Sequence, residues 1–194
     1  MIAAVVLAGG SGSRFGASAK QLAELDGMPL LEHALRAVET VPAIDRIVVV
    51  LGARAEEIRA GVDLGLAEPV VCEDWADGQA ASLRCGIEAV ADLGADAVVI
   101  TLGDMPRITP EVIVRFADIA VRDGAQARAR AVYDGMPGHP VVLGSDYFAR
   151  LTALEGDAGA RQVMRAIGVQ KIECGGLCDA TDVDTPEALE GLRR

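Results

Sequence analysis

Short apolar runs alternate with amphipathic segments along the first half of the chain. Four runs have the length and composition of buried strands: Ala3–Leu7, Arg46–Leu51, Val70–Cys72 and Ala97–Leu102. Apolar residues recur at helical spacing in the segments between them: Pro29–Val38, Ala53–Ala60 and Ala80–Ala91. This alternation predicts a three-layer, Rossmann-like α/β/α fold with a mainly parallel mixed sheet.

The second half of the chain adds a different pattern. A helix is predicted from Thr109, where a capping residue precedes Pro110 at the first turn. The segment 126–143 indicates two strands around a glycine-containing turn rather than another strand–helix–strand unit. Helices around 145–154 and 159–168, a strand near Val169–Cys174 and a closing helix after Thr185 follow. Because no repeat or linker interrupts this order, we expect one domain over residues 1–194.

Composition narrows the class of protein. Hydrophobic residues make up 51% of the chain and aromatic residues only 3%, which favours a core of Ala, Val, Leu and Ile. The net charge of −11 argues against nucleic acid or an anionic membrane as a partner.

No apolar stretch reaches membrane-spanning length and no leader-like segment precedes the first strand, so a cytoplasmic protein is expected. The four cysteines lack the spacing of a disulfide framework, and we expect reduced thiols.

The first apolar run ends in a glycine-rich segment, Gly9-Gly10-Ser11-Gly12-Ser13-Arg14, with Lys20 just beyond. A strand that opens into such a turn can lay backbone N–H groups against phosphate oxygens, and Arg14 and Lys20 would add charge-assisted contacts. The spacing matches neither the P-loop nor the dinucleotide fingerprint, which argues against a Rossmann dehydrogenase. An ordinary tight turn is the alternative. As an exposed loop cation, Lys20 is expected to contribute little to stability.

Carboxylates follow the strands at two further places. Asp104 comes directly after a buried strand and lies five residues before Thr109, the expected helix cap. Its expected role is to hold Mg²⁺, which prefers one or two carboxylates together with phosphate oxygens and water. The second carboxylate is Asp182 or Asp184, and N-capping of the closing helix is the competing role for either of them. Thr185 can supply that cap itself.

Three other segments carry candidate contacts. Gln79 and Ser82 open the third helix, where small residues would let a flat base approach the backbone, although an ordinary helix start explains them equally. His139 stands beside a strand entry as a substrate contact or as a buried, hydrogen-bonded histidine. Asp157 and Arg161 flank a helix start and could bind an anion or fasten the loop.

Taken in order, these segments resemble the molybdenum-cofactor nucleotidyltransferases, the MobA-like branch of the nucleotide-diphospho-sugar transferase fold. The matching segments are Leu7–Gly10, Arg14–Gly16, Lys20–Leu22, Gly27–Leu31, Gly103–Pro106, Gly138–Pro140, Gly156–Arg161 and Asp182–Glu187. The resemblance implies nucleotide-binding residues Leu7, Ala8, Gly9, Gly10, Ser11, Gly12, Gln79 and Ser82. It also implies Mg²⁺ on Asp104 and Asp182, and catalytic roles for Arg14, Lys20 and Asp104. The substrate contacts would be His139, Asp157 and Arg161.

The resemblance also implies a reaction. The segments at 79–84, 138–140 and 156–161 are similar to the cytidylyltransferase branch, whereas Leu7-Ala8-Gly9-Gly10 is similar to the guanylyl branch. The expected activity is Mg²⁺-dependent transfer of CMP from CTP to the phosphate of molybdopterin with release of pyrophosphate, and GTP is the alternative donor. Two rivals are a non-catalytic chaperone that delivers the cofactor to an apo-molybdoenzyme and an enzyme acting on an unrelated phosphorylated acceptor.

Overall fold

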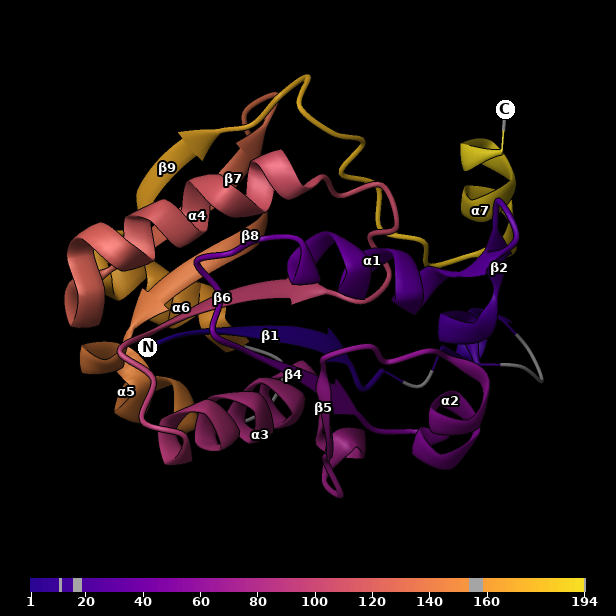
Figure 1. The fold of residues 1–194 in the computed structure, drawn as a ribbon, viewed down its shortest axis with the longest axis horizontal. Helices are drawn as coiled ribbons and strands as arrows, with labels where there is room; N and C mark the ends of the chain where they lie inside the picture. The colour runs from indigo at the N-terminus through magenta and orange to yellow at the C-terminus, as the bar shows by residue number, and fades with distance from the viewer. Residues whose placement is uncertain (11, 16–18, 154–158, 194) are drawn as a thin grey trace.

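A mixed β-sheet forms the centre of the protein (Figure 1). The computed structural model describes residues 1–10, 12–15, 19–153 and 159–193. Among these, seven strands form one sheet in the order β5-β4-β1-β6-β8-β7-β9. Their bounds are β1 Ile2–Ala8, β4 Arg46–Leu51, β5 Glu68–Val71, β6 Ala97–Leu102, β7 Arg128–Tyr133, β8 Met136–Gly144 and β9 Gln170–Glu173. Strand β8 runs antiparallel to both of its neighbours and every other pair is parallel, which confirms the predicted mixed, mainly parallel sheet.

Helices cover both faces of this sheet and make the three layers. Alternate residues of β1 point to opposite sides, because side chains alternate along a strand. Ala4 and Val6 join a core with α1 (Leu30–Glu39) and α4 (Pro110–Asp123). Val5 joins a second core with α3 (Gln79–Asp92), α5 (Phe148–Thr152) and α6 (Gly159–Ile167). The remaining helices are α2 (Ala55–Gly61) and α7 (Pro186–Leu192), with short 3₁₀ turns at 13–15, 20–22, 75–77, 124–126 and 145–147.

Several boundaries differ from the sequence prediction. Helix α2 begins at Ala55 rather than Ala53 because Arg54 adopts a left-handed φ of 64°. The segment from Ser145 starts as a 3₁₀ turn, so α5 covers only Phe148–Thr152. A two-stranded ribbon, β2 (Glu24–Leu25) and β3 (Met28–Pro29), was not predicted because its strands are too short for periodicity. Thr109 stands at the N-cap of α4, but its hydroxyl donates to the Leu177 carbonyl instead of capping the helix.

Two general expectations can be compared with the structure. Among the described helices, none combines the length and the apolar composition needed to cross a bilayer. All four cysteines are free thiols, and Cys85 Sγ lies 2.6 Å from Cys72 Sγ. Burial and the neighbouring Cys72 raise the pKa of Cys85 to about 12, so this thiol is protonated at neutral pH.

Close approach of the main chain at the end of β4 leads to a stability prediction. A Cβ on Gly52 would lie 2.3 Å from the Gly9 carbonyl oxygen and 2.6 Å from Trp75 Cβ. We therefore expect Gly52→Ala to lower the free energy of unfolding by about 2–3 kcal/mol, as overpacking does elsewhere. Urea denaturation measures this. Gly191→Ala is the matched control, since none of the described residues packs an atom within 4 Å of its Cβ position, its own helix α7 and chain neighbours aside. Equal midpoints for the two variants would contradict the prediction.

Candidate functional site

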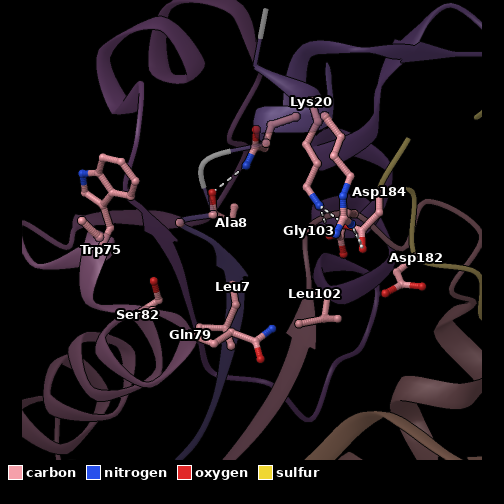
Figure 2. A pocket seen from close by; sticks show the side chains of 18 residues that line it. Leu7, Ala8, Lys20, Trp75, Gln79, Ser82, Leu102, Gly103, Asp182 and Asp184 are labelled. Atoms are coloured by element: carbon pink, nitrogen blue, oxygen red, sulfur yellow. Dashed lines mark hydrogen bonds and ion pairs between the residues drawn. The ribbon is translucent and has the colours of Figure 1, made fainter. Parts of the chain in front are cut away.

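The carboxyl ends of β1 and β6 open into a cavity of about 450 Å³ (Figure 2). The chain passes from β1 to β4 and β5 on one side and returns to β6 on the other side of β1. Open α/β sheets bind ligands at such a switch point. The walls come from four parts of the chain: 7–21, 75–82, 102–104 and the aspartates at 182 and 184.

The floor of the cavity is main chain. A Cβ on Gly9 would lie 2.6 Å from Ser82 Oγ, so glycine lets the end of β1 approach α3. Gly52 allows the end of β4 to approach the Gly9 carbonyl in the same way. The buried Gln21 fixes this edge, because its Nε2 donates to the Ala8 carbonyl oxygen over 2.7 Å. A ligand in the cavity therefore meets backbone groups at this edge, beside the side chains that form the other walls.

A cluster of opposite charges stands at one end of the cavity. Lys20 Nζ donates to Asp104 Oδ2 at 2.5 Å and to Asp184 Oδ1 at 2.8 Å. Arg14 Nη1 lies 3.4 Å from Asp184 Oδ2. The backbone N–H of Val183 donates to the Asp104 carbonyl at 2.8 Å and ties the C-terminal segment to the loop after β6. The Lys20 ammonium thus joins its own segment to Asp184, which lies 164 positions further along the chain.

The expectation that Lys20 is an exposed loop cation is wrong. Its side chain is only 11% exposed, and that of Asp104 is 17% exposed, whereas Arg14 remains 69% exposed. The reason is that the 3₁₀ turn Lys20–Leu22 directs the side chain between two carboxylates from distant segments. Lys20 is therefore a fixed part of the folded structure.

Burial and neighbouring charges shift three pKa values in this cluster. Burial opposes the charge of Lys20, but Asp104 and Asp184 outweigh it and raise the pKa of the ammonium. Burial raises the pKa of Asp104 despite the attraction of Lys20, and the negative charges of Asp182 and Asp184 add to this. The hydrogen bond from Lys20 lowers the pKa of Asp184. Asp104 is thus a buried carboxylate whose charge is incompletely balanced.

The donor set fits a divalent cation. Asp104 Oδ1 is buried and accepts no hydrogen bond from the residues that the structure describes. Asp182 lines the same cavity, which places a second carboxylate within the site. No group of three or more His, Cys, Asp or Glu side chains in the described ranges is arranged as a metal cage. Mg²⁺ does not need one, because it takes one or two carboxylates and completes its shell with water and phosphate oxygens.

Thr185 is the N-cap of helix α7. Its Oγ1 accepts a hydrogen bond from the Ala188 N–H of α7 at 3.2 Å. Neither Asp182 nor Asp184 is the cap. Asp184 is the aspartate held by Lys20 and Arg14, while Asp182 is exposed at the cavity.

The structure brings most of the predicted site residues together. Eleven of them line the cavity: Leu7, Ala8, Gly9, Gly10, Gly12, Arg14, Lys20, Gln79, Ser82, Asp104 and Asp182. Ser11 and Asp157 lie outside the described residues, and only the backbone of Arg161, in α6, is described. His139 is not among the described residues that line the cavity; its carbonyl accepts a hydrogen bond from the Tyr133 hydroxyl at 2.7 Å.

Gln21 and Trp75 are among the cavity-wall residues that the sequence analysis did not single out as candidates. Gln21 follows Lys20 directly and is buried in the same 3₁₀ turn. Trp75 is the single tryptophan of the chain and stands between acidic residues just before the glycine that opens α3. A lone aromatic residue in such a polar segment was the feature of the sequence that could have marked Trp75 as a candidate.

Comparison with known proteins places this fold in a class. A crystal structure of Rv0371c from Mycobacterium tuberculosis H37Rv superposes with a TM-score of 0.84 and 30% sequence identity, covering 98% of this chain and 96% of that one. The fold is that of the α/β nucleotidyltransferases. Within that class, the family model of the MobA-like NTP transferase domain matches residues 4–172. The chain belongs to the MobA-like NTP transferase family.

Two further relatives bear on function. Nicotine blue oxidoreductase of Paenarthrobacter nicotinovorans is 30% identical over 199 residues, covering 98% of this chain and 96% of its own. A crystal structure of Rv0371c in complex with manganese, from the same Mycobacterium tuberculosis strain, has a TM-score of 0.80 and 28% identity and covers 98% of this chain and 97% of that chain. The proteins similar to this chain therefore include one named an oxidoreductase and one whose structure was solved in complex with manganese.

Proposed function

We propose that this protein is a Mg²⁺-dependent nucleotidyltransferase that transfers CMP from CTP to the phosphate of molybdopterin and releases pyrophosphate. The observation that carries the proposal is the buried Lys20–Asp104 pair beside the glycine-rich end of β1. One cavity thereby holds backbone donors and cations for a triphosphate together with a carboxylate oxygen left for a metal ion.

The chemistry follows from this arrangement. An oxygen of the acceptor phosphate attacks the α-phosphorus of the nucleotide in line, the bond from this phosphorus to the bridging oxygen breaks, and pyrophosphate leaves. A phosphate is already ionised at neutral pH, so no general base is required. Lys20 and Arg14 balance the charge that develops on the leaving group, and the glycine-rich backbone orients it.

The metal would be held by Asp104 and Asp182. When bound, Mg²⁺ supplies charge neutralisation at the phosphates. The manganese complex of Rv0371c supports a divalent metal in this family. For the nucleotide, the segments at 79–84 and 138–140 favour CTP, and the Leu7-Ala8-Gly9-Gly10 start keeps GTP as the alternative.

A second candidate function has its own observation in favour. The relative named an oxidoreductase matches this chain over nearly the full length of both proteins. A cavity built for a triphosphate also suits the diphosphate bridge of a nicotinamide dinucleotide, since both present phosphate oxygens to the same donors. The second candidate is therefore a reductase that binds such a dinucleotide without the Rossmann fingerprint, which this chain lacks.

Thermal stabilisation distinguishes these functions. A ligand at a hundred times its Kd stabilises the folded state by about 2.7 kcal/mol, which corresponds to roughly 5–10 °C for a chain of this size. CTP, GTP, UTP, ATP and a reduced nicotinamide dinucleotide are compared, each with and without Mg²⁺. A Mg²⁺-dependent shift with CTP alone supports the proposal, a shift with GTP alone changes the donor, and a shift with the dinucleotide alone favours the reductase. Pyrophosphate release on addition of molybdopterin then separates an enzyme from a chaperone.

A further inference from the structure

Trp75 occupies the wall of the cavity opposite the charge cluster. The residue lies in the 3₁₀ turn Trp75–Asp77 between β5 and α3, and its half-buried side chain lines the cavity. In Figure 2 its ring stands on the side of Ser82 and Gln79, away from Lys20 and Asp184. The cavity therefore has a charged end and an end with an aromatic wall.

The main chain at Trp75 is held by hydrogen bonds within its turn. The backbone N–H of Trp75 donates to the Cys72 carbonyl, and the backbone carbonyl of Trp75 accepts from the Gly78 N–H, both at 3.3 Å. The absence of a side chain on Gly52 lets the indole pack over the end of β4, because a Cβ there would lie 2.6 Å from Trp75 Cβ and 2.9 Å from Cγ. The turn thus places Trp75 at the cavity wall, with its Cβ and Cγ close to Gly52.

The two ends of the cavity fix the orientation of a nucleotide. Phosphates must lie near Lys20 and Arg14, since these are the cations that line the cavity in the part of the chain that the structure describes. The base then lies at the other end, where Leu7 and the indole carbons offer an apolar surface and Ser82 offers a hydroxyl. Every base has a flat π-face, which packs favourably on an aromatic ring.

We propose that Trp75 is the aromatic contact of the nucleobase and a positioning residue of the nucleotide site. The inference rests on the proposed function, because it requires a nucleotide in this cavity. Stacking recognises the flatness of the base and not its hydrogen-bonding edge, so Trp75 contributes affinity for CTP and for GTP alike. Discrimination between bases then falls to polar groups such as those of Gln79 and Ser82.

Fluorescence tests this directly, because Trp75 is the single tryptophan of the chain. The protein is titrated with CTP, GTP and inorganic tripolyphosphate in the presence of Mg²⁺, and calorimetry measures binding in parallel. We expect both nucleotides to change the emission of the indole and tripolyphosphate to leave it unchanged. Nucleotide binding by calorimetry with no change in emission overturns the inference but leaves the proposed function intact. No nucleotide binding by calorimetry overturns both.

Variants provide the second measurement. Trp75→Leu is expected to weaken CTP and GTP binding by at least about fivefold while leaving the affinity for tripolyphosphate unchanged. Trp75→Phe keeps a π-face and should retain most of the nucleotide affinity. A merely structural role would weaken all three ligands together, and that result would overturn the inference. If Trp75→Leu does not fold by circular dichroism, the fluorescence of the natural protein and the Trp75→Phe affinities decide the question.

Discussion

Asp104→Ala is expected to lower turnover at least about a thousandfold, which corresponds to roughly 4 kcal/mol of transition-state stabilisation. The variant loses the buried carboxylate oxygen that fits a metal ion. It should remain folded, because burial disfavours the charge of Asp104 and Lys20 keeps Asp184 as a partner. Pyrophosphate release from CTP and molybdopterin, measured over a range of Mg²⁺ concentrations, checks the prediction.

Asp118→Ala is the matched control for this variant. Asp118 is an exposed aspartate of α4 and does not line the cavity. Its replacement should leave turnover and its dependence on Mg²⁺ unchanged. Full activity in Asp104→Ala would show that this carboxylate takes no part in catalysis, and the metal assignment would be abandoned.

Lys20→Met should lower turnover by about a hundredfold to a thousandfold, the usual effect of removing one fixed donor at a site of developing charge. It should also destabilise the fold, because Lys20 is only 11% exposed and its loss leaves Asp104 without its cation. Pyrophosphate release and urea denaturation measure the two effects. Lys171→Met, at an exposed lysine of β9, is the control and should change neither.

The destabilisation of Lys20→Met should depend on pH. Burial already raises the pKa of Asp104 in the natural protein, and loss of Lys20 removes the charge that opposes this shift. A carboxyl whose pKa is raised by folding costs stability when it is ionised, above the folded-state pKa. The cost should therefore diminish as the pH falls toward the ordinary carboxyl value of about 4. A stability difference that is constant between pH 7 and pH 5 would argue against a charged Asp104 as its cause.

The central sheet could be predicted because its strands are buried on both faces. The stretches Ala3–Leu7, Ile47–Leu51 and Ala97–Ile100 are continuously apolar, as is typical of parallel strands between two helical layers. The ribbon at 24–29 carries no such signal, since each of its strands has two residues. The pattern of apolar residues therefore predicts the strands of the central sheet and misses the short ribbon of β2 and β3.

The site was predictable in its location and less so in its internal contacts. Asp104 could be placed at the cavity because ligands gather at the carboxyl ends of parallel strands. The burial of Lys20 could not, because it depends on Asp184, which lies 164 residues further along the chain. Trp75 was missed for a related reason: its position depends on the missing side chain of Gly52, in a different loop. Contacts between distant loops leave no local pattern.

The main-chain floor at Gly9, against which Gly52 packs, has a consequence for how this protein can diversify. Substitution cannot reshape a surface made of peptide groups, and glycine is the residue that fits without displacing its neighbours there. The floor would present the same donors to any nucleotide, whatever its base. Altered preference must then arise at side chains around the base, in the segment from Gln79 to Ser82. An engineer who wishes to change the donor nucleotide should randomise that segment and leave the two glycines untouched.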